Sequence, residues 1–528
     1  MMESVEEKRD WSRWQPEKVL PDLVRRIDSR YWLAFGAAFV LGLITHIYMF
    51  VNKLPNGDDL ESMYRNYDMT SSGRWFDQIA MSLSSWYSIP WTTGLVALFF
   101  LALSTALLCS LFAFKRKSSV LITAALMATF PVLASQFSYL FYADLYMIAM
   151  CLSIWAIWLA KRHWWGVVPG TLALACAMGC YQAYIGFAVV VCMLSLIAEV
   201  VRNAQKTSAI LLLAVRYLVT GALGVALYFG ILHGALAVLG ETLTDYQGIS
   251  EMGQLPAGGL LAMLPGVYRD FWAYFFQGTY FQVPVFFRGL YALVLAVGAL
   301  LLVYGVIKRG AWKRPQIVVL LIMIAALPIG YNLIYFMAPE AYLHCLMQPQ
   351  YTLFLIMPVI FFECAFDGQK PSFLSEGSSW ILLLASCLIA YQFYLLCNVC
   401  YLNLDLRYEI TYATELRILD RIEQLDGYET DTPVAFIGAF PNKNMNMYPD
   451  GTSDATWGLT GVRGNLVHHE KNYRGFYLNY LGKRMNVLSE EDCRAYDDEA
   501  RTMPYWPENG SVAMVDGVVV VHIWDVAQ

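Results

Sequence analysis

Three carboxylates lie within four residues in the segment Pro55-Asn56-Gly57-Asp58-Asp59-Leu60-Glu61. Carboxylates placed on a turn in this way can act as general acids or bases, provided that a substrate hydroxyl comes within hydrogen-bond reach. The alternative is a hydrated loop built on the Asn-Gly turn. Asp58, Asp59 and Glu61 are therefore the first candidates for chemistry in the chain.

A fourth carboxylate, Asp144, lies in the aromatic segment Phe141-Tyr142-Ala143-Asp144-Leu145-Tyr146. A carboxylate among so many aromatic side chains is costly unless it is paired or hydrated. It could instead cap the helix that follows, which Asp does well. The two roles are compatible.

Two further segments carry polar groups that could bind a ligand. Tyr181, Gln182 and Tyr184 could hydrogen-bond a sugar, or the tyrosines could belong to an aromatic belt at a membrane surface. The belt explains Gln182 less well. His344 could act as an acid, a base or a phosphate contact, or it could be an ordinary loop histidine.

Four arginines lie in the segments expected on the same side as these groups: Arg65, Arg74, Arg269 and Arg288. Arginine suits planar, bidentate recognition of phosphate. Each alone could be a surface residue. As a set they predict an anionic ligand at the level of the lipid headgroups.

The elements that must position these residues are membrane helices. Of the 528 residues, 58% are hydrophobic and only 15% charged, and the mean hydropathy is +0.46. Eleven apolar runs are long enough to cross a bilayer, which needs about 20 residues per helix. They are 30–51, 91–114, 119–138, 144–160, 165–181, 184–201, 217–239, 289–307, 316–337, 349–366 and 379–399.

Lysine and arginine are concentrated in alternate loops between these runs, and positive loops stay in the cytoplasm. This asymmetry predicts a cytoplasmic N-terminal segment over 1–29 and a membrane domain over 30–399, with outer loops at 52–90 and 240–288. It places a soluble domain, 400–528, on the outer side. Met69 to Trp86 and Leu260 to Phe276 are expected to form helices in the interface plane.

The C-terminal segment reads as a small α/β domain. An amphipathic helix is predicted near 406–425, a strand at Pro433 to Ile437, and a hairpin around Asp516-Gly517. The predicted fold class is thus mainly α, a polytopic membrane protein with about eleven transmembrane helices plus a small C-terminal α/β extracytoplasmic domain.

Several classes of function are disfavoured by what the sequence contains. Nothing matches a P-loop, a dinucleotide fingerprint, a metalloprotease helix or a nucleophile elbow. The soluble C-terminal part is acidic, which argues against a nucleic-acid partner. No zinc spacing appears, so no metal site and no required cofactor are predicted; a divalent metal is compatible with the sequence but not indicated.

The order and sidedness of these motifs resemble the GT-C superfamily of membrane glycosyltransferases, and most closely the bacterial type-II glucosyltransferase family that modifies O-antigen. The resemblance rests on Asn56-Gly57-Asp58-Asp59, Tyr142-Ala143-Asp144 and Tyr181-Gln182-Ala183-Tyr184, with a short basic N-terminus and a terminal outer domain. It implies transfer of a hexose, glucose by family, from a polyprenyl-phosphate donor to a glycan or glycolipid acceptor. The location implied is the outer face of a bacterial inner or plasma membrane, with the C-terminal domain periplasmic or extracellular.

The resemblance also implies roles for residues. Asp58 would be the catalytic base, Asp59 its partner or substitute, and Asp144 a second carboxylate that orders the acceptor. The donor phosphate would be held by Arg65, Arg269 and Arg288, and the substrates would be bound by Glu61, Tyr181, Gln182, Tyr184 and His344. Direct displacement would invert the anomeric centre.

Two other classes of function remain open from the residues alone. A transporter or flippase of lipid-linked sugars would place ionisable groups near the membrane midplane, whereas here the acids gather at the outer mouths of the spans. A scaffold would use the soluble domain as its interaction module.

Overall fold

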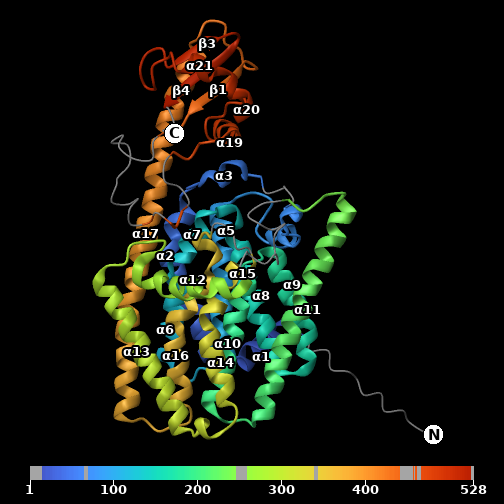
Figure 1. The fold of residues 1–528 in the computed structure, drawn as a ribbon, viewed down its shortest axis with the longest axis vertical. Helices are drawn as coiled ribbons and strands as arrows, with labels where there is room; N and C mark the ends of the chain where they lie inside the picture. Colours follow the sequence, from blue (N-terminus) through green and yellow to red (C-terminus); the bar gives the residue numbers. More distant parts are fainter. Residues whose placement is uncertain are drawn as a thin grey trace, which may run out of the picture.

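The protein is a helical bundle that carries a small domain with a sheet at one end (Figure 1). The computed structural model describes residues 15–64, 69–244, 259–337, 343–440, 456, 458–460 and 465–524. Within these residues nine helical stretches are long and apolar enough to cross a membrane. They are Ser29–Val51, Pro90–Leu111, Lys117–Ser138, Leu140–Arg162, Tyr184–Arg202, Thr207–Leu239, Val285–Lys308, Pro349–Phe366 and Phe373–Glu423.

Two shorter apolar stretches, Trp164–Cys180 and Ile317–Tyr331, complete the bundle. These eleven helical stretches coincide with the eleven apolar runs read from the sequence. The helices concerned are α2 (Ser29–Val51), α5 (Pro90–Leu111), α6 (Lys117–Thr129), α7 (Pro131–Ser138), α8 (Ala143–Arg162), α9 (Val167–Cys180), α10 (Tyr184–Arg202), α11 (Thr207–Leu239), α13 (Val285–Lys308), α14 (Ile317–Tyr331), α16 (Thr352–Phe366) and α17 (Phe373–Glu423).

The centre of the bundle is formed by helices that are buried on nearly all sides. In Lys117–Ser138, Leu140–Arg162 and Tyr184–Arg202, 89% of the most apolar window is buried inside the protein, against 28% in Thr207–Leu239. Helices that are apolar all round are typical of such interior positions. The central helices are therefore held by packing on nearly all sides, and they position the turns and loops at their ends.

Proline interrupts the helical path close to the candidate site. Residue Pro131 is the first residue of α7, so the backbone turns at Phe130 between α6 and α7, where the preceding residue avoids the helical conformation. A 3-10 turn, η3 (Leu140–Tyr142), then joins α7 to α8. This junction presents backbone N–H groups and the aromatic Phe141-Tyr142 pair at the bundle end.

The loop 52–90 is not the interfacial helix that the pattern Met69 to Trp86 predicted. Its described residues, 52–64 and 69–90, hold three short helices instead: α3 (Gly57–Glu61), η2 (Thr70–Ser72) and α4 (Asp77–Met81). Residue Gly73 has φ +83°, and a Cβ atom there would lie 2.1 Å from Nε2 of Gln182. A tight turn packed against the bundle therefore breaks the helix that the apolar spacing suggested.

The second long loop does contain the predicted helix. Helix α12 (Gly259–Ala273) continues into a π-helical turn, η5 (Tyr274–Gly278). The Tyr274 ring stacks on Tyr351, with centroids 3.9 Å apart, and Phe275 stacks on Phe354. Aromatic packing thus fixes this loop to the start of α16.

Helix α17 connects the bundle to the C-terminal domain without a break. Its 51 residues include the predicted span 379–399 and the predicted amphipathic helix near 406–425 except for its last two residues. Figure 1 shows α17 rising from the bundle and ending against the sheet. The last apolar helix is therefore also the stalk of the domain.

The C-terminal domain has a four-stranded sheet in the order β2-β1-β4-β3. Strand β1 (Pro433–Gly438) is parallel to β2 (Asn486–Val487) and β4 (Val518–Trp524), while β3 (Val512–Val515) is antiparallel to β4. The predicted hairpin is confirmed: Asp516 and Gly517 have φ of +48° and +83°, as a primed turn requires. The helices of this domain and the remaining short ones are α19 (Glu470–Tyr480), α20 (Glu490–Cys493), α21 (Asp497–Ala500), α1 (Pro16–Arg26) and α15 (Leu333–Met337).

The two ends of the bundle carry different groups. At the end far from the C-terminal domain, Arg116 pairs with Glu376 in the first turn of α17, with Nη1 3.0 Å from Oε1, and Arg202 lies 3.7 Å from Asp367. Lys115 also pairs with Asp367, so the basic loops after the second and sixth apolar runs lie together. The acidic segment of α3 lies at the other end, beside α19 (Figure 1).

Candidate functional site

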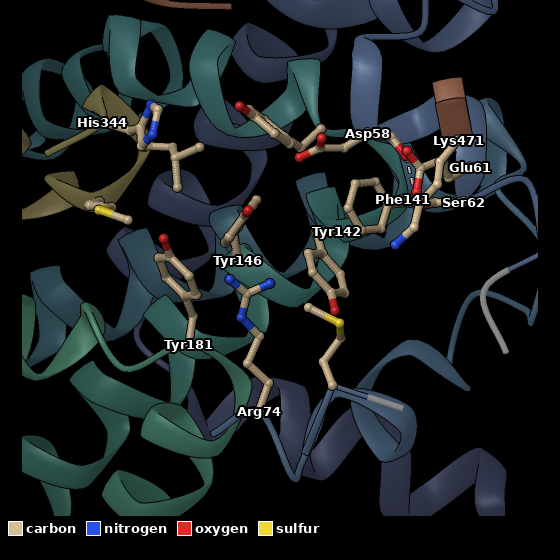
Figure 2. A pocket seen from close by; sticks show the side chains of 14 residues that line it. Asp58, Glu61, Ser62, Arg74, Phe141, Tyr142, Tyr146, Tyr181, His344 and Lys471 are labelled. Carbon is tan, nitrogen blue, oxygen red and sulfur yellow. Dashed lines mark hydrogen bonds between the residues drawn. The ribbon is translucent and has the colours of Figure 1, made fainter. Parts of the chain in front are cut away.

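A cavity of about 650 Å³ opens at the bundle end that faces the C-terminal domain. Its walls come from α3, the loop before α4, the α7–α8 junction with the start of α8, the turn between α9 and α10, the segment before α16, and α19 (Figure 2). It is lined by Asp58, Glu61, Ser62, Met69, Arg74, Tyr139, Phe141, Tyr142, Tyr146, Tyr181, His344, Leu346, Met347 and Lys471. This volume suits a ligand of the size of one or two sugar rings with a phosphate.

Asp58 projects into this cavity from the first turn of α3 (Figure 2). A capping box forms α3 locally, since the Asn56 side chain accepts from Asp59 N and the Asp59 side chain accepts from Asn56 N, both at 3.1 Å. Burial by the cavity walls raises the pKa of Asp58, while the charges of His469 and Arg74 partly oppose the shift. Asp58 thus combines access to the cavity with increased basicity.

The side chain of Asp59 points away from the cavity, and both of its carboxylate oxygens accept hydrogen bonds from the protein backbone. Its oxygens accept from the backbone N–H groups of Leu140 at 3.3 Å and Phe141 at 3.0 Å, in addition to Asn56. Burial raises its pKa to about 7, although the three N–H donors favour the anion. Asp59 is 5% exposed and attaches α3 to the α7–α8 junction, so its position indicates a structural role.

Asp144 is also buried and does not line the cavity. It lies in the first turn of α8, where its oxygens accept from the Ser84 hydroxyl and from Leu145 N. A carboxylate suits the first turn of a helix, because it faces the positive end of the helix dipole. The structure thus gives Asp144 a contact that holds the end of the loop 52–90 to α8.

Among the arginines that the structure describes, Arg74 reaches the cavity. Its guanidinium carbon lies 5.3 Å from the ring centre of Tyr142 and 5.0 Å from that of Tyr181, and Figure 2 shows it rising between the two rings, across the cavity from Asp58. Its Nε is buried and has no hydrogen-bond partner within the described residues. Burial works against its charge, but the surrounding tyrosines raise its pKa, so Arg74 remains a cation with unused donor capacity.

Of the three arginines predicted to hold the donor phosphate, the structure places two, Arg269 and Arg288, and both lie away from the cavity. Arg65 falls outside the described residues. Arg269 has a side chain 72% exposed and pairs with Asp270 at 2.9 Å. Arg288 donates from Nε to Val283 O at 2.9 Å and, like Arg269, is absent from the cavity wall.

The predicted substrate-binding residues divide into two groups. Glu61, Tyr181 and His344 line the cavity. Gln182 and Tyr184 do not: Gln182 Nε2 donates to Ser72 O at 2.7 Å, and the Tyr184 hydroxyl accepts from Gln136. Both of the latter side chains are buried and fix neighbouring segments.

Four cavity residues were not among the predicted site residues: Arg74, Tyr142, Tyr146 and Lys471. Arg74 belonged to a set of four outer-loop arginines that spacing alone could not rank. Lys471 lies about four hundred residues from Asp58 along the chain, and only the fold brings it to the same wall. The sequence around Lys471, which includes His468 and His469, matches no motif that would have identified it as a site residue.

The chemistry available in the cavity is proton transfer and anion binding. Within the ranges that the structure describes, no group of three or more His, Cys, Asp or Glu side chains could hold a metal ion. Asp58 offers a base, His344 an imidazole whose pKa is lowered by burial, and Arg74 a fixed cation. A base and a cation on opposite walls suit a reaction that removes a proton and releases an anion.

Comparison with known proteins adds one finding. The sequence model of the family described as glucosyl transferase GtrII matches residues 47–362, which include α3, Arg74, the α7–α8 junction and His344. No curated protein and no solved structure matches the chain.

Proposed function

Because the chain belongs to the glucosyl transferase GtrII family, we propose that it transfers a glucosyl group from a polyprenyl phosphate to a hydroxyl of a cell-surface glycan. The observation that carries this proposal is the placement of Asp58 and Arg74 on opposite walls of one cavity. Asp58 can accept the proton of the acceptor hydroxyl, and Arg74 can bind the leaving phosphate.

The reaction follows from these two positions. Asp58 takes the proton of the acceptor hydroxyl, and the hydroxyl oxygen forms a bond to the anomeric carbon. The bond between that carbon and the phosphate oxygen breaks, and its electron pair leaves with polyprenyl phosphate. Arg74 stabilises the charge that develops on the phosphate. A single displacement inverts the anomeric centre.

The cavity walls favour a sugar over a more apolar ligand. The rings of Tyr142 and Tyr181 flank the Arg74 guanidinium, and Tyr146 lines the same cavity. Aromatic rings can pack on the apolar face of a pyranose. Figure 2 shows the Tyr146 and Tyr181 side chains directed into the same space as Arg74. The donor sugar would then lie between Arg74 and Asp58.

The membrane arrangement proposed is the one that the loop charges predict. Residues 1–29 would be cytoplasmic, 30–399 would form the membrane domain, and 400–528 would lie on the outer side of a bacterial inner membrane. The cavity would then open on the outer side, where lipid-linked glucose and surface glycans meet. Fusion of topology reporters after residue 64 and after residue 524 tests this, and reporters on opposite sides would contradict it.

A reconstituted assay tests the function itself. Purified protein in proteoliposomes is given synthetic polyprenyl-phosphate glucose and a surface glycan preparation, and the glycan is weighed by mass spectrometry. We expect one added hexose per acceptor with the wild type and none with Asp58→Asn. Movement of the donor across the bilayer without covalent product would support a flippase and contradict the proposal.

A further inference from the structure

Helix α19 of the C-terminal domain packs directly on α3 (Figure 1). Both helices contribute residues to the cavity wall. The Asn472 side chain donates from Nδ2 to Gly57 O and to Glu61 Oε1, both at 3.0 Å. The Asn479 side chain donates to Leu60 O at 3.1 Å. The side-chain amides of Asn472 and Asn479 thus hold both ends of α3.

The apolar side of α3 belongs to the core of the C-terminal domain. Leu60 is fully buried in a cluster with Ile418 of α17 and with Phe476 of α19. A helix of five residues cannot hold itself, because its few hydrogen bonds do not offset the cost of nucleation. The position of α3, and of Asp58 on it, therefore depends on the docked domain.

The two helices approach so closely that only glycine fits at their contact. A Cβ atom on Gly475 would lie 2.4 Å from Leu60 O and 2.8 Å from Leu60 C. Both atoms belong to the backbone and cannot move aside without moving α3. Gly475 therefore sets the distance between the C-terminal domain and the helix that carries Asp58.

One side chain of α19 enters the cavity. Lys471 lines the wall beside Glu61, opposite His344 (Figure 2). His469 Nε2 lies 3.6 Å from Glu61 Oε1 at the same rim. Lys471 and Glu61 together carry no net charge, so they suit a neutral, hydroxyl-rich group, with ammonium donors and carboxylate acceptors side by side.

We propose that α19 is part of the catalytic site: Gly475, Asn472 and Asn479 position Asp58 through α3, and Lys471 with Glu61 binds the acceptor sugar. This inference rests on the proposed function and extends it, since it assigns acceptor recognition to the C-terminal domain. Arg74 and its tyrosines serve the donor phosphate at the other wall. The acceptor hydroxyl then reaches Asp58 from the α19 side.

The first test separates acceptor from donor binding. In the full-length protein, Lys471→Met is compared with Lys483→Met, whose Nζ pairs with Glu423 at 2.6 Å within the C-terminal domain and away from the cavity. We expect Lys471→Met to raise KM for the glycan at least about tenfold with an unchanged KM for polyprenyl-phosphate glucose. Lys483→Met should change neither. An unchanged glycan KM in Lys471→Met overturns the assignment.

The second test concerns positioning. Gly475→Ala is compared with Gly377→Ala in α17, where an added Cβ atom meets nothing within 4 Å. Both changes favour the helical backbone, but only the first displaces α3. We expect kcat to fall at least about tenfold in Gly475→Ala with the donor KM unchanged, and both constants to stay at the wild-type value in Gly377→Ala. Wild-type kcat in Gly475→Ala overturns the positioning role.

Asp58→Asn is measured in parallel, so that the two proposals can fail separately. No transfer by the wild type would overturn the proposed function and this inference together. An active wild type, an inactive Asp58→Asn and unaffected α19 variants would overturn only the role of α19.

Discussion

Asp58 and Asp59 are adjacent carboxylates, and the structure predicts that their amide variants will fail in different ways. Asp59→Asn should loosen the α3 attachment, because three backbone N–H groups converge on its carboxyl. Asp58→Asn should leave that attachment intact and strongly slow glucosyl transfer, because the carboxyl that faces the cavity is lost. The pair therefore forms a matched test of one change at two neighbouring positions.

The size of the Asp59 effect can be worked out from its contacts. Oδ2 accepts from Asn56 and Leu140, and Oδ1 accepts from Phe141. A carboxyl keeps two acceptor oxygens in either protonation state, whereas an amide keeps one. The best orientation of the asparagine retains two bonds and turns its NH₂ group toward Phe141 N. One buried donor left unpaired costs about 1–3 kcal/mol.

Amide hydrogen exchange at Phe141 measures the free energy lost when its N–H group is left unpaired. Since every 1.4 kcal/mol is tenfold, exchange at Phe141 through local opening should be roughly 5- to 150-fold faster in Asp59→Asn. The Asp58→Asn protein should match the wild type within about a factor of two, because a change at a cavity surface alters stability by about 0.5 kcal/mol or less. Its transfer rate should fall by about 10²–10⁴, the usual contribution of a general base.

The reasoning is refuted by the reverse pattern. If Asp59→Asn keeps wild-type protection at Phe141 and still loses transfer, then Asp59 acts in the chemistry and its three backbone contacts do not define its role. If Asp58→Asn retains full transfer, no base is needed at that position.

The remaining predictions concern the cation Arg74, the pH profile, the exposed Arg269 and the need for a metal ion. Arg74→Lys should raise the donor KM by about 10- to 100-fold, because an ammonium cannot make the bidentate contact of a guanidinium, and steady-state kinetics with varied donor would show it. Burial raises the pKa of Asp58 above its ordinary value of 3.8, and Asp58 must be ionised to act as the base, so kcat/KM should fall as the pH decreases through that raised pKa. In Arg74→Gln this fall should occur at higher pH, because the positive charge of Arg74 lowers the pKa of Asp58 and is lost in the variant. Arg269→Gln should change kcat/KM by less than about twofold, since its side chain is exposed and paired outside the cavity; a larger loss would show that the donor extends to α12. Transfer that survives dialysis against EDTA is expected, and loss restored by Mg²⁺ would contradict the predicted independence from metal.

The membrane helices could be predicted because one property, apolar length, decides them. Each of the eleven apolar runs coincides with a helical stretch, and the Asp516-Gly517 hairpin forms as its turn residues require. The prediction of a helix from Met69 to Trp86 was wrong, because the spacing of apolar residues does not reveal where the backbone packs closely against another segment. At Gly73 the chain turns against Gln182, and this tertiary contact overrides the local pattern.

Polar residues near the site were harder to assign, because type and position along the chain do not determine which way a side chain points. Asp58 and Asp59 have the same chemistry and adjacent positions, yet the capping box directs one carboxyl inward to the α7–α8 junction and leaves the other at the cavity. Gln182 and Tyr184 were candidates for sugar binding, and both are used to fix buried segments. Their roles depend on partners that only the fold supplies.

The same argument explains why the most informative contact lies beyond any local motif. The α3 segment is polar on one side and has a single large apolar side chain, Leu60, on the other. In an isolated loop that leucine would be exposed, and five residues would not hold a helix. Its burial in a core built from residues more than 350 positions further along the chain holds α3 in place, and Gly475 at that contact lets the two backbones come together. The acidic segment is thus ordered by the C-terminal domain, so a catalytic carboxylate on α3 requires that domain to be docked.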